Sequence, residues 1–223
     1  MARLGVPIVT LESGDRLSRD EFERRYGQCP HIKKAELIEG VVYVASPVRI
    51  RYHAQPHSDL IFWAKTYCLA TPGVMMGNDG TVRLDAKNET QPDIFLRYQE
   101  GGQSRISDDD YIEGAPELIA EIAASSASYD LHDKKDVYCR CGVKEYLVWV
   151  VPEQIFHWFR LDHQIYVCQP PDQQGIIQSS TFPGLWLNIP ALLSGEMLQV
   201  LETLQAGLNS PEHQEFVQRL SKS

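Results

Sequence analysis

The stretch PELIAEIAAS, at residues 116–125, constrains the fold more than any other part of the sequence. Residues 118–124 are apolar except for Glu121, and a nearly continuous apolar run is typical of a central β-strand covered on both faces. An isolated buried carboxylate is costly unless a cation pairs with it or it holds a metal. The sequence therefore predicts a buried strand whose central glutamate is paired or binds a metal.

The composition is ordinary for a globular protein, with 43% hydrophobic and 23% charged residues in a chain of 223. No apolar run approaches the roughly 20 residues that span a bilayer, and the N-terminus has too little apolar length for a secretory signal. We therefore expect a cytoplasmic protein with no membrane partner. The cysteines are odd in number and scattered, so we expect reduced thiols; they are Cys29, Cys68, Cys139, Cys141 and Cys168. A zinc site at residues 139–141 is not expected, because no second Cys/His pair has matching spacing.

The net charge of −9 argues against a general nucleic-acid binder held by a basic surface. The charge is uneven, however, because residues 31–67 contain five Lys/Arg against three Asp/Glu. That local surplus is weak support for a side of the protein that faces phosphate.

Helices and strands alternate through the middle of the chain, and hairpins lie at both sides. This order predicts one α/β domain over residues 1–223, with a mixed central β-sheet flanked by helices and extra β-hairpins. Ser18 is the expected N-cap of the first helix, and Ser128 or Asp130 that of the helix ending before Gly142. The expected helices are 18–27, 52–70, about 128–142, 192–208 and 210–220; the expected strands are 74–77, 81–85, 93–98, 116–125 and 144–151; the expected hairpins are 35–47 and 154–170; and the expected surface loop is 100–116.

Two carboxylates and a lysine fall at suggestive places in this pattern. Asp93 begins a strand directly after Pro92, and Glu121 lies in the next strong strand, 28 residues later. Lys134 or Lys135, in the helix after that strand, could point back at the end of the sheet. Two carboxylates from adjacent strands are a minimum for a hard ion such as Mg²⁺. A lysine beside that metal could position or deprotonate an attacking water and offset charge on a phosphate.

The segments QPDIFL, GAPELIAEIAASS and DLHDKKDVYCRCGVKEYLVWVV resemble the Uma-two family, a branch of the PD-(D/E)XK nuclease superfamily. The upstream AELIEGVVYVASPVRIRYHAQPHSDL and the downstream TFPGLWLNIPALL fit the same family. The resemblance covers roughly residues 15–195. It implies a restriction-endonuclease-like core over that range, followed by C-terminal helices over about 196–221.

The resemblance also implies roles for particular residues. Asp93 and Glu121 would ligate a metal, and Glu36, in AELIEG, would help to complete its coordination. Lys134 corresponds to the lysine that this family carries on the following helix. Tyr138 would support Lys134 from the same helical face.

The sequence departs from the superfamily pattern at Ala123, where the usual lysine lies two residues after the second acid. Lys134 can replace that lysine if it points into the site; if it points into solvent, the site would bind a metal but catalyse poorly. His53 and His57 share one helical face, which is compatible with zinc or with an ordinary helix start. His53 could instead line the cleft near a phosphate.

Other interpretations of the same residues stay open. Glu121 could form a structural ion pair with Lys134, and Glu36 could be a solvated hairpin residue. The tryptophans in apolar strand or turn contexts are expected in the core rather than as base-stacking platforms; they are Trp149, Trp158 and Trp186.

We expect an endonuclease that hydrolyses DNA phosphodiester bonds with Mg²⁺, for which Mn²⁺ could substitute. It would hold one metal, or two about 4 Å apart, and act as a symmetric homodimer. The alternatives are a catalytically degenerate nuclease fold that binds nucleic acid or protein, and a hydrolase of a smaller phosphoester.

Overall fold

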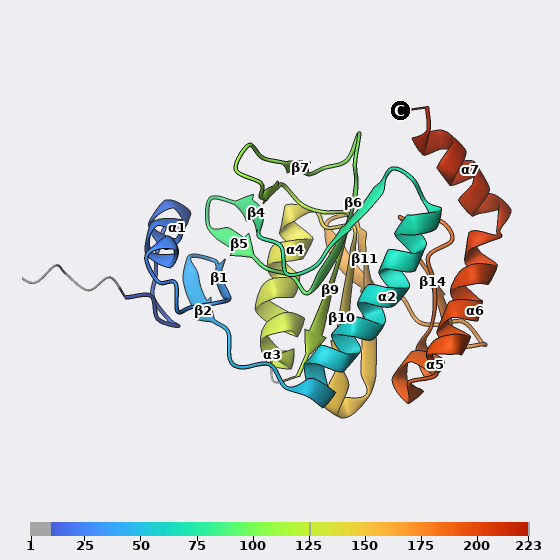
Figure 1. The fold of residues 1–223 in the computed structure, drawn as a ribbon, viewed down its shortest axis with the longest axis horizontal. Helices are drawn as coiled ribbons and strands as arrows, with labels where there is room; N and C mark the ends of the chain where they lie inside the picture. Colours follow the sequence, from blue (N-terminus) through green and yellow to red (C-terminus); the bar gives the residue numbers. More distant parts are fainter. Residues whose placement is uncertain (1–9, 125, 223) are drawn as a thin grey trace, which may run out of the picture.

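The computed structural model describes residues 10–124 and 126–222, and two six-stranded β-sheets carry the fold of these residues (Figure 1). The central sheet has the order β12-β11-β10-β9-β6-β3. Strands β9 and β10 are parallel, while the other pairs in this sheet are antiparallel. The sheet is therefore mixed, as the sequence predicts. Its strands are β3 (Val74–Gly77), β6 (Ile94–Tyr98), β9 (Leu118–Ala123), β10 (Glu145–Val150), β11 (Ile155–Asp162) and β12 (Ile165–Cys168).

Helices cover both faces of the central sheet. Because side chains alternate along a strand, Leu118, Ala120 and Ile122 of β9 pack toward α2 and the C-terminal helices, which lie beyond α2 in Figure 1. Ile119 and Ala123 pack on the opposite face, against α4. The helices are α1 (Arg19–Gly27), α2 (Gln55–Ala70), α3 (Ala127–Tyr129), α4 (Lys135–Cys141), α5 (Ile189–Ser194), α6 (Met197–Leu208) and α7 (Pro211–Leu220). The π-helical turns are η1 (Ile50–Ala54) and η2 (Asp130–Lys134), and η3 (Val151–Glu153) is a 3₁₀ turn.

The second sheet has the order β2-β1-β5-β4-β8-β7 and packs beside α4 (Figure 1). The predicted hairpin turns at Glu39 and Gly40, whose φ angles of 51° and 73° fit a two-residue turn of the type that matches strand twist. The strands are β1 (Ala35–Ile38), β2 (Val41–Val44), β4 (Val82–Asp85), β5 (Asn88–Thr90), β7 (Arg105–Ile106) and β8 (Ile112–Glu113); a separate hairpin pairs β13 (Ile176–Gln178) with β14 (Trp186–Asn188).

Three local predictions are wrong, and strand β5 was missed. The helix predicted over 192–208 is interrupted at Gly195, whose φ of 76° ends α5 before α6 begins. The segment 100–116 is not only a loop, because β7 and β8 form within it and extend the second sheet. Strand β5 lacks any apolar periodicity, since its residues are Asn, Glu and Thr, yet all three are buried. The helical segment after β9 begins at Ala127, so neither Ser128 nor Asp130 caps it. Asp130 lies inside it, where its carboxylate accepts a hydrogen bond from the Ser126 hydroxyl.

The remaining expectations concern tryptophans, cysteines and membranes. Trp149 and Trp158 are buried in the core, as predicted, and Trp186 is partly buried against α6. The five cysteines, all among the described residues, form no disulfide bonds. Among the described residues, the helices are too short or too polar to cross a membrane.

Candidate active site

Glu121 lies at the centre of β9, on the face that is packed against α4, and it is 3% exposed. Two groups from the following helical segment reach one of its oxygens. The Lys134 Nζ lies 3.0 Å from Glu121 Oε1, and the Tyr138 hydroxyl donates to the same oxygen at 2.9 Å. Because Lys134 and Tyr138 are four residues apart, they share one helical face. The buried carboxylate is therefore paired, and the lysine points into the site rather than into solvent.

Glu36, on β1 of the second sheet, contacts the same lysine. Its Oε2 lies 2.9 Å from Lys134 Nζ, and its Oε1 accepts a hydrogen bond from the Gln91 backbone N–H at 2.7 Å. The Asp130 carboxylate is 3.8 Å from the same ammonium. Burial alone would lower the pKa of Lys134, but the carboxylates of Glu121 and Glu36 hold it well above its usual value. Lys134 is thus a protonated ammonium surrounded by three carboxylates.

Asp93 precedes β6 and faces a lysine and a histidine. Its Oδ1 lies 3.1 Å from Lys34 Nζ. Its Oδ2 accepts a hydrogen bond from the Ile122 backbone N–H at 2.7 Å and lies 3.3 Å from His53 Nε2. Burial would raise the pKa of Asp93, yet His53, Lys34 and the Ile122 N–H hold it well below its usual range. The Asp93 backbone N–H, 3.5 Å from Glu121 Oε2, joins the two carboxylates.

The two histidines expected on one helical face both reach Asp93. His53 approaches its carboxylate, and His57 Nε2 lies 2.8 Å from its backbone oxygen. His53 belongs to η1 and His57 to α2, and their ring centroids are 5.6 Å apart. Contact with Asp93 accounts for this pair without a shared zinc ion.

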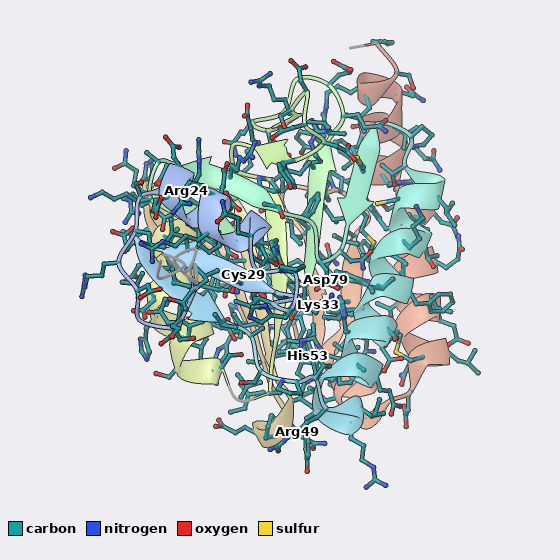
Figure 2. The ribbon with its side chains drawn as sticks, turned by 60° about the vertical axis from the view of Figure 1, so that its left-hand side comes forward. Arg24, Cys29, Lys33, Arg49, His53 and Asp79 are labelled. Atoms are coloured by element: carbon teal, nitrogen blue, oxygen red, sulfur yellow. The ribbon has the colours of Figure 1, made fainter. Side chains whose placement is uncertain are left out.

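These groups lie on the floor of a cleft of about 1210 Å³ between the β1–β2 hairpin, the start of α2 and the end of β9. Figure 2 shows Asp79, His53 and Arg49, three of its lining residues, one below another between the second sheet and α2. Among the described residues, five carboxylates but only three lysine or arginine side chains line the cleft. The cleft therefore has an excess of negative charge at its floor.

Glu121 responds most strongly to this excess. Burial, together with the neighbouring carboxylates of Asp93, Asp130 and Glu36, raises the pKa of its carboxyl group to about 8 against the opposing effect of Lys134. A divalent cation would relieve such repulsion, and carboxylate oxygens are the ligands that Mg²⁺ prefers. In residue type and charge, the site therefore fits a hard divalent metal.

The carboxylates are not already arranged around one point. In residues 10–124 and 126–222, no three His, Cys, Asp or Glu side chains are spaced to hold a metal. The lysine ammonium groups lie between the carboxylates instead, Lys134 between Glu36 and Glu121 and Lys34 beside Asp93. Metal binding would accordingly require small side-chain movements that displace these ammonium groups.

Six site residues proposed from the sequence meet here, and three further residues were missed. The six are Glu36, His53, Asp93, Glu121, Lys134 and Tyr138. Lys34 precedes Glu36 by two residues, so it falls on the same face of an extended chain, and that spacing could have revealed it. Asp130 precedes Lys134 by four residues and was interpreted as a cap. Tyr129 lines the cleft, with Lys134 Nζ 5.4 Å from its ring centroid, and no sequence signal marked it.

The fold matches a solved nuclease-like structure. A protein described as a "putative nuclease belonging to DUF820", from Anabaena variabilis ATCC 29413, superposes with a TM-score of 0.57 at 16% sequence identity. The match covers 72% of this chain and 89% of the other. At this identity the similarity supports the shared fold. No protein among those with curated descriptions matches the chain.

A family profile described as "Uma2: Putative restriction endonuclease" matches residues 19–190. That range contains Glu36, Asp93, Glu121 and Lys134, and it agrees with the span of about 15–195 inferred from the sequence. The chain therefore belongs to the Uma2 family.

Proposed function

We propose that this protein is a divalent-metal-dependent endonuclease that hydrolyses phosphodiester bonds of DNA. The observation that carries the proposal is the buried group of Glu121, Lys134, Glu36 and Asp93 at the floor of one cleft. Membership in a family described as "Putative restriction endonuclease" supports a nucleic acid as the substrate. We retain Mg²⁺ as the metal, with Mn²⁺ as a substitute.

Asp93, Glu121 and Glu36 would hold the metal once the lysine ammonium groups move aside, since all three line the same cleft. When bound, the metal would polarise a phosphoryl oxygen and lower the pKa of a water molecule. Tyr138 donates to Glu121 Oε1 and fixes the orientation of that carboxylate, as groups behind metal ligands commonly do.

Lys134 has two conceivable roles, and its surroundings favour one. Because its pKa is held well above the usual value, it keeps its proton at neutral pH. A protonated lysine cannot accept a proton from water, but it can donate hydrogen bonds and offset the charge that develops on the phosphate. We assign Lys134 this electrostatic role, and Lys34 the role of neutralising Asp93 before metal binds.

The dimensions of the cleft favour a polymer over a small phosphoester. Its volume of about 1210 Å³ exceeds the roughly 300–1,000 Å³ of ordinary small-molecule pockets. A symmetric dimer, in which two sites meet two strands, is retained as part of the proposal, and light scattering of the purified protein tests it.

The test is nicking of supercoiled and single-stranded DNA with Mg²⁺ or Mn²⁺. We expect metal-dependent nicking by the wild type and a loss of at least about 100-fold in Glu121→Gln and in Lys134→Met, because both remove charges that act on the transition state. Glu202→Gln is the matched control, since Glu202 is an exposed carboxylate on α6.

Two results would contradict the proposal. Nicking that persists in Glu121→Gln would indicate a contaminating nuclease or another site. Binding of Mn²⁺ and DNA without cleavage would favour the degenerate binding module instead.

A further inference from the structure

Residues 45–52, with the sequence ASPVRIRY, form an exposed segment that runs from the end of β2 into the π-helical turn η1, here called the rim segment. All eight residues are exposed. Val48 is 62% exposed, Ile50 72% and Tyr52 45%. Single exposed apolar residues are common, but three within five positions form a patch of the kind that usually marks an interaction site.

The rim segment is also basic. It contains Arg49 and Arg51 and no acidic residue, within a chain whose net charge is −9. Neither guanidinium has a carboxylate within 4 Å among the described residues, whereas many other arginines, such as Arg83, Arg140 and Arg160, form ion pairs. Two unpaired positive charges beside exposed apolar side chains suit a partner that is both anionic and apolar.

The rim segment is continuous with the cleft that contains the acids. Val48, Arg49 and Tyr52 line that cleft, and Figure 2 shows Arg49 at its lower end, below His53. Farther in, the rings of Tyr43 and Tyr129 pack with centroids 4.2 Å apart. An extended ligand could thus contact apolar and aromatic groups on its way from the rim to the floor.

The floor lies deep. Glu121 and Asp93 are each 3% exposed, and Glu36 is 7% exposed. A phosphate has to approach these buried carboxylates closely for the proposed reaction. A single strand, whose bases are free to turn outward, can enter such a cleft without the unpairing that a duplex requires.

We propose that the rim segment binds a single-stranded, unstacked stretch of DNA and leads it into the cleft. Val48, Ile50 and Tyr52 would cover the exposed faces of the bases, and Arg49 and Arg51 would bind the adjacent phosphates. The inference rests on the proposed nuclease function and adds a preference for single-stranded over duplex DNA.

The test is fluorescence anisotropy with a labelled oligonucleotide of about 20 nucleotides, longer than the roughly 4–16 nucleotides that single-strand-binding folds cover. The same sequence as a blunt duplex is compared, with Ca²⁺ in place of Mg²⁺ to limit cleavage. We expect tighter binding of the single strand, and a loss of about tenfold in a Val48→Ser/Ile50→Ser double variant, which removes base contacts.

The charge contribution has a separate signature. In an Arg49→Gln/Arg51→Gln variant, the slope of log affinity against log salt should fall by about 1.4, since each lost phosphate contact on a single strand contributes about 0.7. The matched controls are Leu198→Ser, an 80% exposed apolar residue on α6, and Arg105→Gln, an exposed arginine on β7. Both controls should bind like the wild type.

The outcomes separate this inference from the nuclease proposal. If the wild type cleaves DNA in a Glu121-dependent manner but the rim variants bind single strands as tightly as it does, the rim inference is wrong and the nuclease stands. If the rim variants lose equal affinity for single-stranded and duplex DNA, the single-strand preference is contradicted. A dimer that dissociates in the Val48→Ser/Ile50→Ser variant, with DNA binding unchanged, would assign the patch to a second copy of the chain.

Discussion

Replacement of Glu121 by glutamine distinguishes a functional carboxylate from a structural one. In the metal-free protein, burial and nearby carboxylates raise the pKa of Glu121 to about 8 from an ordinary value of 4.5. The folded state therefore binds the proton more tightly than the unfolded state, and stability falls as the pH rises from about 4.5 to about 8. At neutral pH the metal-free fold therefore keeps Glu121 largely protonated, whereas the unfolded chain is ionised there, and this difference destabilises the fold.

The magnitude follows from that pKa. The raised pKa of Glu121 lowers the free energy of unfolding by about 1.4 kcal/mol for each pH unit between the ordinary pKa and pH 7, or by at most about 3.5 kcal/mol. Glutamine removes this cost but also loses the charge-assisted hydrogen bond with Lys134, which contributes about 1.5–3 kcal/mol. We expect the two changes nearly to cancel, so that metal-free Glu121→Gln unfolds within about 1 kcal/mol of the wild type.

The assay is urea unfolding at pH 7, in a chelator and again in millimolar Mg²⁺ or Mn²⁺. Metal should stabilise the wild type and have little effect on Glu121→Gln, since a ligand that binds only the folded state raises its stability. A loss of about 3–5 kcal/mol in the chelator would refute this reasoning, because breaking a buried structural ion pair has that cost.

Glu145 supplies the matched control on the neighbouring strand. It is fully buried in β10 and accepts hydrogen bonds from the Trp158 indole, the Ser179 hydroxyl and the Thr181 backbone N–H. Glu145 is surrounded by hydrogen-bond donors, whereas the surroundings of Glu121 include three other carboxylates. Glu145→Gln should therefore lower the free energy of unfolding by at least about 2 kcal/mol, since the NH₂ group of the glutamine amide would meet other hydrogen-bond donors.

Three further predictions concern stability and metal binding. Lys134→Met should destabilise the metal-free protein by about 3–5 kcal/mol, because it leaves Glu121 without its cation. Mn²⁺ should restore more stability to this variant than it adds to the wild type, and a calorimetric experiment in which Mn²⁺ restores none would contradict the prediction. Glu89→Gln should stabilise the protein at pH 8.5 by about 1–2 kcal/mol and have little effect at pH 5, because burial and Glu23 raise the pKa of Glu89 to about 8. If the stability of the wild type and that of the variant change in parallel with pH, this prediction is refuted. Gly142→Ala should lose about 1 kcal/mol in urea unfolding, since Gly142 ends α4 with a φ of 87° and has no close neighbour to clash with.

Local pattern was sufficient for much of the fold. The apolar run around Glu121, the turn at Glu39 and Gly40, and the amphipathic spacing in α2 each encode their element in neighbouring residues. Strand β5 escaped prediction because its three polar residues are buried between two partner strands. One partner, β4, directly precedes β5, but the other, β1, is distant in the sequence. Strands this short form only when a neighbouring strand supplies their hydrogen bonds.

The sequence by itself identified most of the residues that form the candidate site, although not Lys34, Asp130 or Tyr129. Asp93 and Glu121 stand out because a carboxylate at the start or in the middle of a buried strand needs compensation, whatever the rest of the chain does. The next helical segment offers Lys134 or Lys135, and the family resemblance selects Lys134 and adds Glu36.

Only the tertiary structure decided how these residues are paired. Glu36 lies in one sheet and Glu121 in another, and Lys134 joins them because packing sets the second sheet beside α4. Lys34 reaches Asp93 across 59 residues for the same reason. Periodicity reports which face a side chain occupies, but not which distant face packs against it, so the partners of a buried charge depend on the complete fold.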